Sequence, residues 1–132
     1  MNILVVDDEP TSRLLLRSLL EYEGEGSQTV LLAENGEEAL RKITGRVVDL
    51  IISDVYMPVM NGIEFFKTVR EMPGFEKVPF LFVSGYDDHC AREVITNPRR
   101  EGFFKKGSPA KKLLEWVRYL TAPEEKRPAF AP

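Results

Sequence analysis

Asp49-Leu50-Ile51-Ile52-Ser53-Asp54 is the stretch that indicates the fold most directly. The apolar run begins at Val47, shows no alternation of apolar and polar residues, and leads into an aspartate. A short continuous apolar run is typical of a β-strand that is buried on both faces, as in a parallel sheet. We therefore predict a buried strand over residues 47–52, with Asp54 at its carboxyl end.

Four other short apolar runs occur along the chain, and amphipathic segments lie between them. The runs cover residues 3–6, 29–33, 80–83 and 103–104. Strand alternating with helix five times predicts an α/β domain with a doubly wound, five-stranded parallel sheet and helices on both faces. Sheets of this kind carry their sites at the carboxyl ends of the strands.

Three of the intervening segments begin with a helix-capping signal. Asn35 and Asn61 each stand three residues before a glutamate, which is the spacing of a capping box. Ser108 is expected as a further N-cap, with Pro109 in the first helical position.

Two segments depart from the regular pattern. The fourth helix should lie between residues 87 and 97 and be short or irregular, because Pro98 cannot continue it. Residues 122–132 contain three prolines and mixed charge, which predicts a disordered tail after a domain over residues 1–121.

Composition and the distribution of apolar residues argue against several classes of protein. The chain has 132 residues, 43% of them hydrophobic, and a net charge of −3, which argues against nonspecific binding to nucleic acid or anionic membrane. No apolar run approaches the ~20 residues that cross a bilayer, and the N-terminus lacks the basic region of a signal peptide. A single cysteine, Cys90, excludes an intramolecular disulfide, so we expect a cytoplasmic location.

Residues with reactive side chains end the predicted strands, and they should gather at one edge of the sheet. They are Asp7 and Asp8, Asp54, Ser84, and the pair Lys105-Lys106. Three carboxylates that repel each other at one place favour a cation, and an all-oxygen ligand set suits Mg²⁺ better than zinc. Capping of the first helix is the alternative, but it explains only one of the two adjacent aspartates.

A carboxylate, a cation, a lysine and a hydroxyl together form a site for phosphoryl transfer. A lysine can bind a phosphoryl oxygen, and a serine hydroxyl can donate to the same oxygen. Because phosphoryl transfer needs mainly positioning and charge neutralisation, this small set is sufficient.

The sequence resembles the receiver domains of two-component response regulators, the chemotaxis-type single-domain fold, over residues 1 to about 121. The matching pieces are Asp7-Asp8-Glu9-Pro10, residues 33–40 and 49–58, Asn61-Gly62, Val83-Ser84-Gly85 and Phe103-Phe104-Lys105-Lys106. The resemblance implies a flavodoxin-like (βα)5 sheet with strand order 2-1-3-4-5.

The resemblance also implies roles at the metal site. Asp54 takes the place of the phosphoacceptor and is itself a metal ligand. Asp8 takes the place of the direct Mg²⁺ ligand, with Asp7 acting mostly through a water molecule. The backbone carbonyl of Tyr56 takes the place of a third protein ligand.

Two further positions correspond to the switch residues of the family. Ser84 takes the place of the switch hydroxyl, and Phe103 that of the aromatic side chain that changes rotamer on activation. Lys106 fits the family spacing of the site lysine, with Lys105 as the alternative. Gly107 stands where the family usually has a proline, which leaves the geometry of that turn open.

The expected function is therefore a single-domain receiver that accepts a phosphoryl group from a histidine kinase or a phosphotransfer protein. It would signal to an unknown downstream protein, without direct DNA or membrane binding, as a monomer or a weak dimer. Tyr56 and Tyr86 each lie two residues after a site residue, and we hypothesise that they hinder the hydrolytic water and lengthen the phosphorylated lifetime.

Other classes fit less well. A haloacid dehalogenase-type phosphatase would need an aspartate where Tyr56 stands, and a flavodoxin-like carrier needs a phosphate loop that Asp7-Asp8-Glu9 would repel. A receiver-shaped interaction module that is not phosphorylated remains the alternative function.

Overall fold

In the computed structural model, which describes residues 1–23, 28–129 and 131–132, five parallel strands form one sheet in the order β2-β1-β3-β4-β5. The strands are β1 (Asn2–Val6), β2 (Thr29–Ala33), β3 (Leu50–Asp54), β4 (Phe80–Ser84) and β5 (Glu101–Lys105). The predicted doubly wound α/β fold and its strand order are therefore confirmed.

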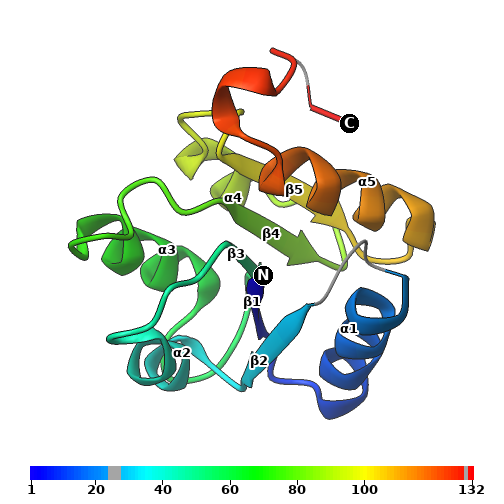
Figure 1. The fold of residues 1–132 in the computed structure, drawn as a ribbon. Coiled ribbons are helices and arrows are strands. Elements are labelled where there is room, and N and C mark those ends of the chain that lie inside the picture. Colours follow the sequence, from blue (N-terminus) through cyan, green and yellow to red (C-terminus); the bar gives the residue numbers. More distant parts are fainter. Residues whose placement is uncertain (24–27, 130) are drawn as a thin grey trace.

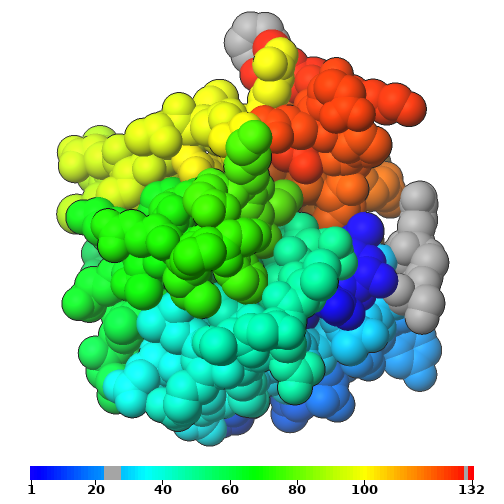
Figure 2. All heavy atoms as spheres, turned by 60° about the vertical axis from the view of Figure 1, so that its left-hand side comes forward, coloured from blue at the N-terminus to red at the C-terminus, as the bar shows by residue number. Residues whose placement is uncertain are grey.

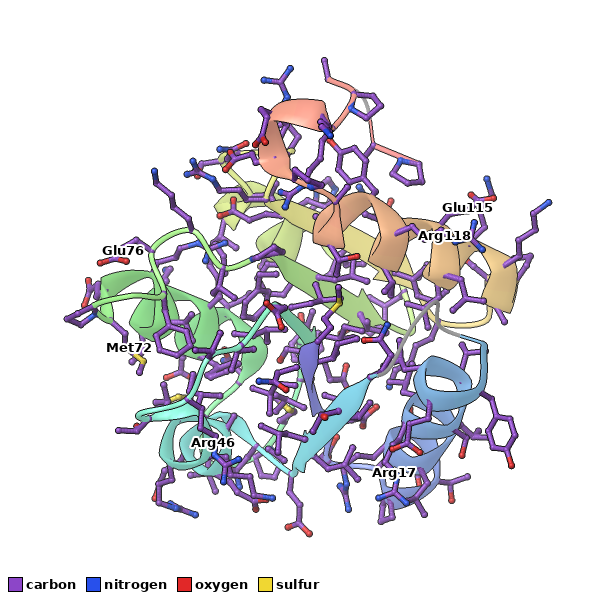
Figure 3. The ribbon with its side chains drawn as sticks, in the orientation of Figure 1. Arg17, Arg46, Met72, Glu76, Glu115 and Arg118 are labelled. Carbon is purple, nitrogen blue, oxygen red and sulfur yellow. The ribbon has the colours of Figure 1, made fainter. Side chains whose placement is uncertain are left out.

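Helices cover both faces of the sheet (Figure 1). On one face lie α1 (Pro10–Glu23) and α5 (Ala110–Thr121); on the other lie α2 (Gly36–Ile43), α3 (Gly62–Glu71) and the short α4 (His89–Val94). Each face buries its own apolar cluster against the sheet. Labelled charged side chains such as Arg17 and Glu115 point outward from the helices (Figure 3). Within the described residues, no helix has the length and apolar character needed to span a membrane.

The strand register brings the carboxyl ends of β1, β3, β4 and β5 to nearly one level. Val6 pairs with Ser53, Asp54 with Val83, and Ser84 with Lys105. The residues that follow β1 therefore emerge next to the last residue of β3, and those that follow β5 emerge two strands away from β3, beyond β4. All lie at the edge where a parallel sheet carries its sites.

Two of the predicted helix starts agree with the sequence signals. Asn35 Oδ1 accepts a hydrogen bond from the Glu38 N–H at 2.9 Å. Asn61 forms a complete capping box with Glu64, at 2.9 Å and 3.2 Å.

The predicted cap at Ser108 is wrong, because α5 begins at Ala110 and Pro109 occupies the cap position without a side-chain hydrogen bond. Gly107 adopts a left-handed φ of 91° and turns the chain. The Ser108 N–H then donates to the Lys105 carbonyl at 3.2 Å, so Ser108 belongs to this turn and not to the helix.

Strand β3 is shifted relative to its predicted bounds. It begins at Leu50 and runs to Asp54, whereas Val47 is 74% exposed. The Asn2 side chain holds the Val47 carbonyl at 2.7 Å, and the Asn2 N–H donates to the Asp49 carboxylate at 2.7 Å. These bonds make residues 47–49 a loop that leads into the sheet.

Helix α4 has only six residues, as expected for a short fourth helix. The buried carboxylate of Glu101 accepts hydrogen bonds from the N–H groups of Thr96 and Asn97, at 2.9 Å and 3.1 Å. Arg70 pairs with the same carboxylate at 2.9 Å. Glu101 therefore accepts the hydrogen bonds of two backbone N–H groups that carbonyls of a longer helix would otherwise have accepted.

The tail after α5 makes contacts with the domain. A 3₁₀ turn over Glu124–Lys126 brings Glu124 to within 2.8 Å of Arg100, and the Tyr119 hydroxyl donates to the Pro128 carbonyl at 2.7 Å. Figure 2 shows the red tail beside the yellow segment near residue 100. The boundary at residue 121 and the disorder of the tail stay predictions, and residue 130 lies outside the described residues.

Gly102→Ala is expected to lower the free energy of unfolding by about 1–3 kcal/mol, the usual cost of overpacking. A Cβ at Gly102 would lie 2.2 Å from a ring carbon of Trp116, so the indole would have to move. Urea unfolding measures the change. Gly85→Ala is the matched control, because its Cβ would meet nothing within 4 Å. Equal losses in the two variants would contradict this packing argument.

Candidate functional site

Three carboxylates gather at the carboxyl edge of the sheet. Oxygens of Asp7, Asp8 and Asp54 all lie within 4.8 Å of one another. Asp7 and Asp8 follow β1, and Asp54 ends the neighbouring strand β3. The donor set is all oxygen and partly open to solvent, since Asp8 is exposed while Asp7 is buried. Such a set fits Mg²⁺, which binds through a few carboxylates and keeps several water ligands.

Helix capping does not account for this cluster. The N-terminus of α1 is capped by Glu9, whose carboxylate accepts hydrogen bonds from the N–H groups of Thr11 and Ser12 at 3.1 Å and 2.6 Å. These backbone hydrogen bonds lower the pKa of Glu9. Asp7 and Asp8 are therefore not needed as caps, and the sequence-based alternative for them loses its basis.

Lys106 lies between two of the carboxylates. Its Nζ is 3.1 Å from Asp7 Oδ2 and 3.3 Å from Asp54 Oδ2. The backbone N–H of Lys106 donates to the Ser84 carbonyl at 2.7 Å, which holds the Lys106 backbone beside the end of β4. Lys105, the alternative lysine, is exposed at the end of β5. Of the two candidates, Lys106 is the one whose ammonium contacts the cluster.

The charges in this cluster shift one another's proton affinities. Burial raises the pKa of Asp54; the Lys106 ammonium opposes that rise, and the Asp7 charge adds to it. Burial alone would lower the pKa of Lys106, but its attraction to Asp54 and Asp7 prevails and raises it. At neutral pH the lysine therefore stays charged, while the ionised Asp54 is held at some cost in free energy.

Asp7 is held by more groups than the sequence indicated. Its Oδ1 accepts a hydrogen bond from the Glu9 N–H at 2.9 Å, and its Oδ2 accepts one from the Ser12 hydroxyl at 2.6 Å. Arg13 donates to the Asp7 carbonyl at 2.6 Å. Ser12 is absent from the residues predicted from sequence, because a serine in the first turn of a helix is common and carries no signal of its own.

The loop after β3 needs glycine at one position. The Gly62 N–H donates to the Val55 carbonyl at 2.8 Å, and a Cβ on Gly62 would lie 2.1 Å from the Asp54 carbonyl oxygen. The start of α3 therefore packs directly against the backbone of Asp54. This close approach is the physical reason for glycine in the Asn61-Gly62 pair.

The two predicted switch residues are both buried. Ser84 ends β4 and is 1% exposed, beside the Val83–Asp54 pair of the sheet. Phe103 lies on β5 and is 7% exposed, and the guanidinium of Arg92 from α4 lies 4.5 Å from its ring centre. Phe103 thus occupies an inward position beneath a cation.

Two exposed tyrosines stand at the rim of the site. Tyr56 and Tyr86 stack with ring centres 5.7 Å apart and an interplanar angle of 25°. The Tyr56 hydroxyl is hydrogen-bonded to the buried carboxylate of Asp88, which raises the pKa of Tyr56. Asp88 in turn caps α4 by accepting from the Ala91 N–H at 2.9 Å. The loops after β3 and β4 are therefore joined through Tyr56, Tyr86 and Asp88.

Asp54→Asn is expected to raise the free energy of unfolding of the metal-free protein at neutral pH, by on the order of 1 kcal/mol. A raised carboxyl pKa contributes stability below the ordinary pKa, and that stability is lost as pH rises through the folded-state value. The advantage of the variant should therefore be largest at neutral pH and shrink as the solution becomes acidic.

Urea unfolding at neutral and acidic pH, in the presence of a chelator, measures this effect. Asp49→Asn is the control, because Asp49 lies at the other end of β3 and accepts a hydrogen bond from Asn2. A variant at Asp54 that is less stable than wild type at neutral pH would refute the electrostatic account.

Comparisons with known proteins agree with this geometry. The family model of the response regulator receiver domain matches residues 3–118. An uncharacterized 14.6 kDa protein of Leptolyngbya boryana is 44% identical over 103 residues, which cover 78% of this chain and 74% of that protein. A probable chemotaxis protein CheY of Rhizobium etli is 36% identical over 90 residues, which cover 68% of each chain.

The structural likeness extends over most of the chain. The response regulator protein TrrA of Thermotoga maritima, solved in complex with Mg²⁺-BeF, has a TM-score of 0.75 and 33% sequence identity. The match covers 90% of this chain and 97% of that one. With a family model over most of its length and a CheY relative above 30% identity, the chain belongs to the family of response regulator receiver domains.

Proposed function

We propose that this receiver accepts a phosphoryl group on Asp54 in a Mg²⁺-dependent reaction and signals by a conformational change. The observation that carries the proposal is the position of the Lys106 ammonium, 3.1 Å from Asp7 and 3.3 Å from Asp54. Receivers are signalling domains, so the phosphoaspartate is the signal and not an intermediate of turnover.

In the proposed reaction, an Asp54 carboxylate oxygen attacks phosphorus while the bond from phosphorus to the donor's nitrogen or acyl oxygen breaks. Lys106 and the Ser84 hydroxyl would then contact the phosphoryl oxygens and compensate their charge. These roles agree with the requirements of phosphoryl transfer, which depends on positioning of the reacting groups and on electrostatic stabilisation of the transferred group.

The carboxylate cluster would hold the cation. Asp8 and Asp54 would bind Mg²⁺ directly, Asp7 mainly through a water molecule, and the Tyr56 carbonyl would add a further oxygen. When bound, Mg²⁺ supplies positive charge that offsets the carboxylates and the incoming phosphoryl group. The TrrA structure supports Mg²⁺ as the cation, because that similar response regulator was solved in complex with Mg²⁺-BeF.

The signal would pass through the buried switch residues. A phosphoryl group on Asp54 would draw the Ser84 hydroxyl toward it and open space next to Phe103. Phe103 already lies inward beneath Arg92, so a shift of α4 would accompany any change of its rotamer. The outer face of α4, β5 and α5 would present this change to a protein partner.

The proposed donor is a histidine kinase or a phosphotransfer protein, and the proposed receiver of the signal is another protein. The proposal includes neither DNA nor membrane contact. It keeps the cytoplasmic location and the monomer or weak dimer expected from the sequence.

Incubation with Mg²⁺ and acetyl phosphate is expected to add the mass of one phosphoryl group to the intact protein. Asp54→Ala should show no gain, while Asp49→Asn should gain as wild type does. Lys106→Ala should slow the reaction about 10²–10³-fold, the usual cost of losing one stabilising donor. Intact-protein mass spectrometry over time gives all these rates.

Wild-type protein that gains no mass and binds neither Mg²⁺ nor beryllofluoride would exclude the proposed chemistry. The alternative would then be a receiver-shaped interaction module that is not phosphorylated.

Replacing Tyr56 and Tyr86 together by asparagine is expected to speed dephosphorylation several-fold. The stacked rings lie at the rim of the site, 51% and 55% exposed, and would restrict the approach of water to the phosphoaspartate. Loss of the mass gain after removal of the donor measures the rate. Tyr22→Asn, on the exposed side of α1, is the control, and an unchanged rate in the double variant would show that the rings do not shield the site.

A further inference from the structure

Ser12 places its hydroxyl on the acidic cluster. Its Oγ donates to Asp7 Oδ2 at 2.6 Å, whereas its own N–H donates to the Glu9 carboxylate at 2.6 Å. The helix cap is therefore complete without the hydroxyl. The Ser12 hydroxyl is not needed for the cap, and it contacts Asp7, the most deeply buried carboxylate of the site.

Ser12 and Lys106 share one oxygen atom. Asp7 Oδ2 accepts from Ser12 at 2.6 Å and from Lys106 at 3.1 Å, while Oδ1 accepts from the Glu9 N–H at 2.9 Å. The hydroxyl is the nearer of the two partners on Oδ2. Without the Ser12 hydroxyl, Asp7 Oδ2 would keep Lys106 as its donor, because a buried carboxylate oxygen cannot replace a lost donor with water. The Lys106 ammonium would then be drawn closer to Asp7.

We propose that Ser12 is a positioning residue for phosphoryl transfer: its hydroxyl fixes the Asp7 carboxylate toward the cation site and leaves Lys106 shared between Asp7 and Asp54. The proposal rests on the function proposed above. Groups that orient a metal-binding carboxylate through hydrogen bonds commonly control the metal affinity of the site. Ser12 occupies this position from α1, and Arg13 of the same helix contacts the Asp7 backbone carbonyl instead of the carboxylate.

The surroundings of Ser12 permit a close test. Ser12 and Lys106 both border a pocket of about 270 Å³ between α1 and α5, which is lined mainly by apolar side chains. The additional methyl group of Ser12→Thr can be accommodated there while the hydroxyl is kept. Ser18 lies on the same helix and is exposed, so Ser18→Ala removes a hydroxyl of the same type away from the site.

The experiment measures the Mg²⁺ dissociation constant of wild type and the three variants by NMR titration, together with the thermal unfolding of each in a chelator. Ser12→Ala is expected to bind Mg²⁺ about tenfold more weakly, at the lower end of the range for such groups. Ser12→Thr should return the affinity to near the wild-type value, and Ser18→Ala should leave it unchanged.

A purely structural serine would lower the unfolding temperature of Ser12→Ala without changing its Mg²⁺ affinity, and this result would overturn the proposal. Wild type would still bind Mg²⁺ in that case, so the proposed function would stand. Wild-type protein that binds no Mg²⁺ would instead overturn both.

Discussion

The repulsion between two poorly solvated carboxylates is the constraint on which the site depends. Asp7 is 1% exposed, and an oxygen of Asp54 lies within 4.8 Å of one of its oxygens. The ammonium of Lys106 contacts both, which lowers the free energy of a charge arrangement that would otherwise be unfavourable. The pKa of Asp54 nevertheless remains raised, chiefly because the carboxyl is buried and in smaller part because of the Asp7 charge. A site of this kind gains stability from any further positive charge, which is the physical basis for binding a cation.

The fold meets this constraint by fixing the backbone on every side of the cluster. Parallel pairing sets the ends of β1, β3 and β4 at one level, and the Ser84 carbonyl anchors the Lys106 N–H at 2.7 Å. Gly62 brings the start of α3 against the Asp54 carbonyl, and Glu9 caps α1 so that the aspartates beside it are not used as caps. Each charged group is therefore held by elements that are themselves packed into the two apolar clusters.

The same edge is linked to the most irregular part of the molecule. The Tyr56 hydroxyl is bonded to Asp88, and Asp88 caps the six-residue α4. From α4, the Arg92 guanidinium lies over the Phe103 ring. Beyond the helix, Glu101 replaces a missing helical turn by accepting two backbone N–H groups. A change at Asp54 thus has a short physical route to α4, whose length and few internal hydrogen bonds make it easier to move than the longer helices.

The sequence by itself predicted the α/β fold class from its apolar runs and capping signals. The residues that end the strands predicted which side chains gather at the sheet edge. The strand order came from the resemblance to the receiver family. These predictions were correct because buried parallel strands and capped helices can be identified from residues that are close together in the sequence. Local patterns misplaced the start of β3 and the cap of α5, because the Asn2 side chain and the turn at Gly107 decided those boundaries. Family spacing had already favoured Lys106 over Lys105, and the tertiary structure shows its ammonium in contact with Asp7 and Asp54. Only the tertiary structure brought Ser12 onto Asp7 and set Arg92 over Phe103. These contacts join groups from different elements, and their distances depend on how helices pack on the sheet.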